Sequence, residues 1–231
     1  MPRRILIIVT SNARMGDTGK PTGLWAEELA APYFAFVDAG FDVEIASPQG
    51  GTAPMDPGSL KPKGENDAVV ERLLADEAAQ RKVASTRPVA EVDAAAYDAV
   101  FFPGGHGTMW DLPGDAGVTR AVESAYAAGR IVAAVCHGPA GLVSARRPDG
   151  QPLVAGKRVN AFTDDEEREA GQAETVPFLL ESRLRSLGAK FEKTGNWQPY
   201  AVRDGQLITG QNPQSSAEVA RLVLQALGDA D

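Results

Sequence analysis

The chain has 231 residues and a formal net charge of −8. This length supports one sizeable hydrophobic core and is short for two. The acidic balance and the lack of any basic run in the sequence exclude a general electrostatic attraction to nucleic acid or to anionic membranes, so we expect neither as a partner.

The chain contains one cysteine, Cys136, which cannot form an internal disulfide, so nothing points to an oxidising compartment. No apolar run in the sequence approaches the length that is needed to span a bilayer. The first residues carry two arginines and then a short apolar run, which is too short for the core of a signal peptide. We therefore expect a soluble protein in the cytoplasm.

Strand and helix patterns alternate along the chain. Apolar, β-branched segments are typical of strands buried on both faces of a sheet, and they occur at residues 4–11, 42–48, 99–105, 131–136 and 158–163. Apolar residues at helical spacing predict helices at residues 22–40, 117–129, 176–188 and 213–227. The alternation predicts a single α/β domain over residues 1–231 with a mainly parallel sheet.

An insertion at about residues 50–90 interrupts the alternation. Residues 50–66 are rich in Gly, Pro and Lys and predict a long loop, and residues 67–85 predict an inserted helix. A long loop of this kind is either a solvated excursion or a functional segment such as a lid over a site. Later in the chain, Asp204-Gly205 joins two alternating runs and predicts a hairpin.

The stretch IVAAVCHGPAG places the cysteine where a buried strand turns into a helix. Ligands bind beyond the carboxyl ends of the strands in open parallel sheets. Ala134 and Gly138 provide the small flanking residues that a sharp nucleophile turn requires, and helix N-terminal amides would lower the pKa of the thiol. A free cysteine is otherwise a small buried hydrophobe, but this position and the adjacent histidine favour a nucleophile at Cys136.

The chain has two histidines, and both follow predicted strands. His137 adjoins the cysteine and is either an acid–base group or a structural histidine at the start of a helix. His106 follows Gly104 and Gly105, whose backbone amides could approach a developing oxyanion, and it either lines the pocket or caps the loop. A glutamine amidotransferase of the triad class needs a histidine well downstream of its cysteine, and none follows His137.

Four segments together resemble the DJ-1/PfpI superfamily of class I glutamine-amidotransferase-like proteins: TGLWAEELAAPY, FFPGGHGTMWDLP, AAVCHGPAGL and AFTDDEE. Within it, they are most similar to the branch of chaperone-like heat-shock proteins and glutathione-independent glyoxalases (glyoxalase III). The resemblance extends over nearly the whole chain. It implies a flavodoxin-like fold, which is a three-layer α/β/α sandwich with a mainly parallel central sheet.

The resemblance also implies a catalytic triad. Its nucleophile falls on Cys136 and the adjacent histidine on His137. Its carboxylate, which lies after the segment AFT, falls on Glu167, or on Glu166 if the turn differs by one residue. The acidic run at residues 164–167 alone would indicate no more than negative charge that complements a helix dipole.

A separate glutamate on the first helix contacts the cysteine sulfur in this superfamily, and the spacing to Pro32 places it at Glu28 rather than Glu27. The residues alone are equally consistent with a solvated helix face at this pair. A protonated glutamate beside a thiolate would stabilise the charged sulfur by a hydrogen bond. The resemblance further implies that an oxyanion site uses the backbone amides of Gly105 and His137.

By the same resemblance, the protein is a glyoxalase III-type lyase that converts methylglyoxal and water to D-lactate without glutathione, metal or organic cofactor. The Cys136 thiolate would add to the aldehyde of this small dicarbonyl and form a hemithioacetal. His137, supported by Glu167, would move a proton between the two carbons through an enediol. Water would then release the acid.

Three other functions are open from the sequence. A stress-related chaperone or deglycase-like protein would expose an apolar patch. A cysteine hydrolase of the PfpI type would act on amides with the same adjacent cysteine and histidine. A pseudo-enzyme would sense oxidation through Cys136. A symmetric homodimer is the expected assembly.

Overall fold

Seven strands align in one central sheet. The computed structural model describes residues 3–228, and in them the strand order of this sheet is β3-β2-β1-β4-β5-β9-β8. Neighbouring strands are parallel except β8 and β9, which form an antiparallel hairpin. The strands are β1 (Arg4–Ile8), β2 (Asp42–Ser47), β3 (Arg87–Pro88), β4 (Ala99–Phe102), β5 (Ile131–Val135), β8 (Ala201–Asp204) and β9 (Leu207–Gly210).

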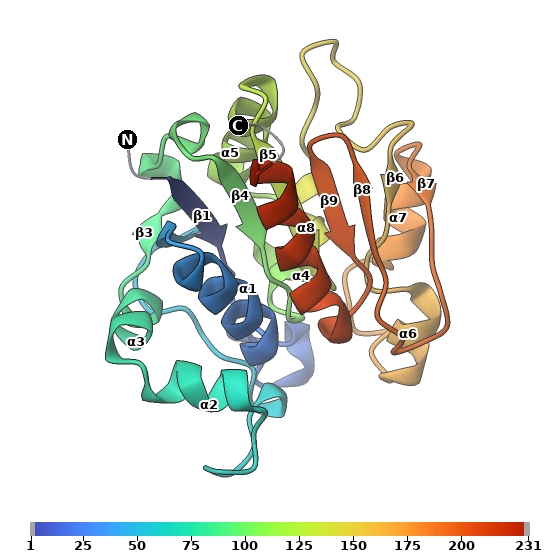
Figure 1. Cartoon of the computed structure of the whole chain (residues 1–231). Helices are drawn as coiled ribbons and strands as arrows, with labels where there is room; N and C mark the ends of the chain where they lie inside the picture. The colour runs from blue at the N-terminus through green and yellow to red at the C-terminus, as the bar shows by residue number, and fades with distance from the viewer. Residues whose placement is uncertain (1–2, 229–231) are drawn as a thin grey trace.

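Helices cover both faces of this sheet (Figure 1). They are α1 (Ala26–Asp38), α2 (Ala68–Ala75), α3 (Glu77–Ala84), α4 (Thr108–Asp111), α5 (Ala116–Ala127), α6 (Asp164–Glu169), α7 (Leu180–Ser186) and α8 (Ser216–Gly228). Helices α1 and α8 pack side by side on one face, and α4 and α5 contribute to the core on the other. The expected flavodoxin-like three-layer α/β/α sandwich is therefore confirmed.

The two cores explain why the central strands are continuously apolar. Along β1, Ile5 and Ile7 belong to the core under α1 and α8, whereas Leu6 and Ile8 belong to the core under α5. All four side chains are fully buried, since successive residues of a strand point to opposite faces and helices cover both.

One predicted strand does not join the central sheet. In residues 158–163, only β6 (Arg158–Val159) is a strand, and it pairs in parallel with β7 (Lys190–Phe191) as a separate small sheet. The backbone N–H of Asn160 donates to the Thr209 side chain at 2.8 Å instead of continuing the ladder. Tertiary hydrogen bonding overrides the β-branched composition at this segment.

The insertion differs from the expectation in one respect. The predicted helix at residues 67–85 is two helices, α2 and α3, because Asp76 between them caps the second and accepts a hydrogen bond from the Ala79 N–H at 2.9 Å. Helix α2 packs against α1, and the chain then forms the edge strand β3. The lid role of this insertion stays a prediction.

The expected hairpin is present with its turn shifted by one residue. Asp204 pairs with Leu207, so the two-residue loop is Gly205-Gln206 rather than Asp204-Gly205. Gly205 has a φ of +65°, which is typical of glycine at the first central position of a tight hairpin turn. None of the helices in residues 3–228 has the length and apolar character required to cross a membrane.

Candidate active site

Cys136 lies immediately after β5 in a left-handed backbone conformation with a φ of +59°. Such a conformation costs a non-glycine residue about 1–3 kcal/mol and persists only where neighbours enforce it. Here the Cys136 N–H donates to the Gly210 carbonyl and the Cys136 carbonyl accepts from the Phe162 N–H, both at 2.9 Å. The sharp strand-to-helix turn predicted from the sequence is thus present, with the sulfur at its apex.

His137 contacts both other members of the predicted triad, Cys136 and Glu167. Its Nδ1 lies 3.3 Å from the Cys136 Sγ, and its Nε2 lies 2.7 Å from Oε2 of Glu167. Glu167 and not Glu166 therefore faces the histidine. The direct cysteine–histidine contact could not be inferred from adjacency, because neighbouring side chains usually diverge.

Glu166 has a different environment from that of Glu167. It completes a capping box at the start of α6, in which its Oε2 accepts from both the N–H and the hydroxyl of Thr163. Its other oxygen accepts from the backbone N–H of Trp197 at 2.9 Å and from two side-chain amides. The buried side chain of Glu166 therefore connects three segments of the chain by hydrogen bonds, and none of these bonds is to His137.

Glu167 also holds the second histidine. Its Oε1 lies 2.7 Å from Nε2 of His106, and the rings of His106 and His137 contact each other with centroids 4.2 Å apart and planes tilted by 41°. Burial raises the pKa of Glu167, but the two histidines outweigh it and hold the pKa well below the usual range. A carboxylate only accepts hydrogen bonds, so both histidines present Nε2–H to it.

This arrangement fixes the tautomer of His137. With Nε2 protonated, Nδ1 of a neutral ring is left as an acceptor that faces the thiol. Burial, followed by the proximity of His106, lowers the pKa of His137. The neutral form is therefore favoured, and this is the form that can accept a proton.

The expectation of a lowered thiol pKa is wrong. Burial, followed by the Glu28 carboxyl, raises the pKa of Cys136. The residues that follow it form a five-residue 3-10 helix, Gly138–Leu142, and not a longer α-helix. The resting sulfur is thus a thiol, and a thiolate forms when His137 accepts the proton.

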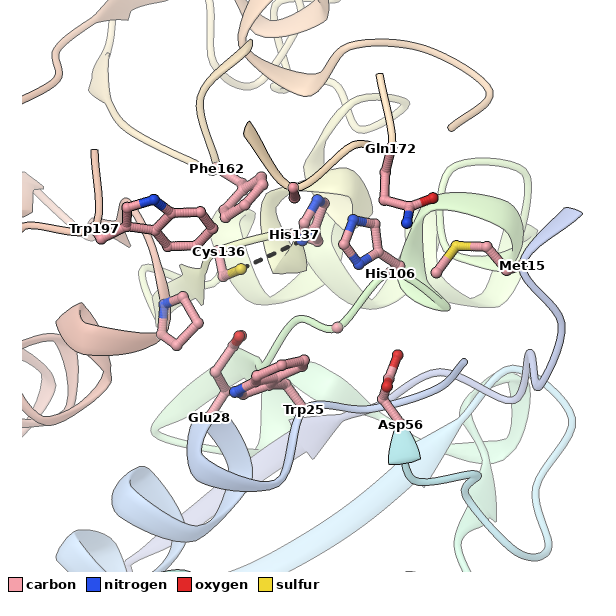
Figure 2. A pocket seen from close by; sticks show the side chains of 13 residues that line it. Met15, Trp25, Glu28, Asp56, His106, Cys136, His137, Phe162, Gln172 and Trp197 are labelled. Carbon is pink, nitrogen blue, oxygen red and sulfur yellow. Dashed lines mark hydrogen bonds between the residues drawn. The ribbon is translucent and has the colours of Figure 1, made fainter. Parts of the chain in front are cut away.

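Glu28 lies on α1 and is completely buried, with its carboxyl directed toward Cys136 (Figure 2). Its Oε2 accepts a hydrogen bond from the Gly104 N–H at 2.7 Å. Burial raises the pKa of Glu28 to about 8, although the Gly104 amide and Cys136 oppose the rise. At neutral pH this carboxyl therefore carries a proton that it can donate.

The backbone N–H groups of Gly104 and Gly105 differ in their hydrogen bonding. The Gly104 N–H is taken by Glu28 and is not available to an oxyanion. The backbone N–H groups of Gly105 and His137 have no acceptor within residues 3–228. Gly105 has a φ of +98°, and a Cβ on it would lie 2.3 Å from the Gly23 carbonyl oxygen, so only glycine suits this approach.

A cavity of about 250 Å³ opens at these groups. Besides the predicted residues, its lining includes three aromatic side chains and a carboxylate that the sequence reasoning missed: Trp25, Phe162, Trp197 and Asp56. Figure 2 shows Phe162 and Trp197 beside Cys136, with Trp25 across the cavity from them. The wall of the site is thus largely apolar.

The two histidines and Glu167 are also a set that could hold a metal ion. Their nitrogen and oxygen atoms lie within 4.8 Å of one another, and imidazole with carboxylate is a common donor set. In the described structure, these atoms satisfy one another through the two 2.7 Å contacts.

The chain is similar to several known proteins over nearly its whole length. The chain is 30% identical to Glyoxalase 3 of Candida albicans over 96% of this chain and 98% of that protein. It is 32% identical to the glutathione-independent glyoxalase HSP31 of Saccharomyces cerevisiae over 98% of each. The crystal structure of glyoxalase III from Candida albicans matches with a TM-score of 0.86 at 29% identity and covers 97% of both chains. A sequence model described as the DJ-1/PfpI family matches residues 22–226, and the chain therefore belongs to this family.

Proposed function

We propose that the protein is a glutathione-independent glyoxalase of the glyoxalase III type, which converts methylglyoxal and water to D-lactate. The observation that carries the proposal is the contact of 3.3 Å between the Cys136 sulfur and His137 Nδ1, beside a protonated Glu28 and an open cavity. The names of the relatives in Candida albicans and Saccharomyces cerevisiae support the same activity.

In the first step, His137 Nδ1 takes the thiol proton and the Cys136 sulfur adds to the aldehyde carbon. We expect the backbone amides of Gly105 and His137, which have no acceptor within residues 3–228, to hold the oxyanion that develops. The imidazolium, which the Glu167 carboxylate stabilises, then returns its proton to this oxygen. The product is a neutral hemithioacetal on the sulfur.

In the second step, neutral His137 removes the proton from the former aldehyde carbon and gives an enediolate. Glu28 is protonated at neutral pH and can donate a hydrogen bond to it. Return of the proton to the neighbouring carbon, together with transfer of the hydroxyl proton of the first carbon to the oxygen of the second, gives a thioester of lactate. Attack by water breaks the carbon–sulfur bond, releases D-lactate and restores the thiol.

The test is to incubate the purified protein with methylglyoxal, without glutathione or added metal, and to measure D-lactate and L-lactate separately. We expect steady D-lactate production by the wild type and none by Cys136→Ala. A folded wild type whose thiol reacts with iodoacetamide but which makes no lactate would contradict this assignment and favour a hydrolase or a redox-sensing role.

We also propose that the protein forms a homodimer in the cytoplasm, that its small-molecule partner is a dicarbonyl, and that it acts in the response to stress. The insertion at about residues 50–90 supports a lid within the single domain, because its Asp56 lines the cavity. A holdase would need an exposed apolar patch. The large apolar side chains exposed in residues 3–228 are Val37 and Leu74, and these two residues give the holdase alternative little support.

A further inference from the structure

The cavity beside Cys136 is larger than a methyl substituent requires. Its volume is about 250 Å³, whereas an apolar cavity of about 150 Å³ is enough to bind benzene. The two carbons that react would occupy only the end of the cavity at the Cys136 sulfur. We propose that the preferred substrates are neutral 2-oxoaldehydes with an aromatic or branched apolar substituent, which the three aromatic side chains around the cavity bind; this inference rests on the function proposed above.

Phe162 and Trp197 form one continuous wall with the catalytic histidine. The ring of Phe162 packs against His137 with centroids 4.4 Å apart and the ring planes tilted by 35°, and it meets the Trp197 indole edge-on at 5.5 Å. Trp25 lies across the cavity from this pair (Figure 2). A planar apolar group between these rings would gain burial and aromatic contact that a methyl group cannot provide.

The backbone of Trp197 indicates that its place in this wall is enforced. Its φ is +61°, which is a rare conformation for a large side chain. The buried Glu166 carboxylate accepts from the Trp197 N–H at 2.9 Å and also binds the side-chain amides of Gln211 and Asn212. Glu166 is therefore a positioning residue, which fixes the indole at the cavity although it does not line the cavity itself.

The charges around the cavity favour a neutral substituent. Asp56 lines the cavity, and its two oxygens accept from the Thr22 hydroxyl and the Gly58 N–H, both at 2.8 Å. No arginine or lysine is among the lining residues that the structure describes. A substituent with its own carboxylate or phosphate would meet an acidic group and no cation.

The experiment compares kcat/KM for methylglyoxal, isopropylglyoxal and phenylglyoxal. We expect the wild type to prefer phenylglyoxal to methylglyoxal by about tenfold or more, since even small apolar groups in a fitted pocket change kcat/KM by about that factor. Trp197→Gly should reduce this ratio about tenfold, and Trp197→Phe should keep most of it. Intrinsic differences in aldehyde reactivity cancel when variants are compared by their ratios.

The glycine variant is chosen so that loss of folding does not decide the result, because glycine adopts a φ of +61° without strain. Its thermal unfolding is recorded beside the activity. If Trp197→Gly lowers kcat/KM for all three substrates by the same factor, or if the wild type prefers methylglyoxal, the inference is overturned.

Failure of the proposed function would give a different pattern, in which no 2-oxoaldehyde is turned over at all. The inference is then tested by binding, with acetone and acetophenone as probes that differ only in the phenyl group. Protection of the Cys136 thiol from iodoacetamide at an acetophenone concentration about tenfold below that of acetone would support it. Equal protection by the two ketones would overturn it.

Discussion

At Gly104, next to the candidate oxyanion site, there is no room for a side chain. A Cβ there would lie 2.6 Å from the His137 backbone nitrogen and 2.7 Å from Glu28 Oε2. Gly104→Ala should displace both groups and reduce D-lactate formation by about 100-fold or more, the usual loss when one oxyanion donor is removed. It should also destabilise the fold by about 1–3 kcal/mol, as overpacking does. Lactate assays and urea unfolding measure the two effects.

Gly114→Ala is the matched control for this substitution. Gly114 is exposed, and a Cβ there would meet no atom within 4 Å. We expect activity equal to that of the wild type and stability within about 0.5 kcal/mol. Full activity in Gly104→Ala would mean that the backbone yields at this point and that the tight approach is not needed.

The residues that carry local sequence signals were predictable, and those that carry none were not. Cys136 and His137 lie in one motif, and Thr163 with Glu166 has the spacing of a capping box, which could have assigned Glu166 to the cap and left Glu167 for the histidine. Trp197 reaches the cavity from a loop distant in sequence, and its left-handed backbone depends on a tertiary hydrogen bond to Glu166. No local pattern predicts such a contact.

At the scale of elements, the caps of the two inserted helices offer a matched pair. Asp76 accepts a hydrogen bond from the Ala79 N–H at the start of α3, whereas Asp67 precedes α2 and makes no side-chain cap bond. Asp76→Ala should lower the free energy of unfolding by about 1 kcal/mol. Asp67→Ala should change it by less than about 0.5 kcal/mol. Urea unfolding measures both, and equal losses would show that the cap bond does not account for the difference.

The elements with one strong periodic signal were predicted well. Strands β4 and β5 are apolar throughout, and β1 is apolar after Arg4, because both faces of these strands are buried. Strand β2 buries its apolar residues but begins at the exposed Asp42. The helices between the strands carry apolar stripes. Residues 158–163 also combine apolar and β-branched residues but end their strand at Val159, since the next residues form hydrogen bonds to the chain around β5 and β9. Composition indicates burial there, but it does not specify the partner strand.

For the molecule as a whole, two buried carboxyls give folding stability opposite dependences on pH. The lowered pKa of Glu167 contributes stability above its unfolded pKa, and this is lost as the pH falls into the acid range. Glu28 does the reverse. Its pKa rises from 4.5 when unfolded to about 8 when folded, so its contribution is complete below about pH 4.5 and is lost as the pH rises toward 8.

Glu28→Gln should therefore remove a decline in stability on the alkaline side. Glutamine keeps a carbonyl acceptor for the Gly104 N–H but has no proton to lose. Between about pH 5 and about pH 8, the free energy of unfolding of the wild type should fall by about 3–4 kcal/mol relative to that of the variant. When the unfolding free energies of the two proteins are subtracted at each pH, the contributions of all other titrating groups cancel. Parallel curves over this range would mean that Glu28 ionises at its ordinary pKa, in which case it could not serve as a proton donor beside Cys136 at neutral pH.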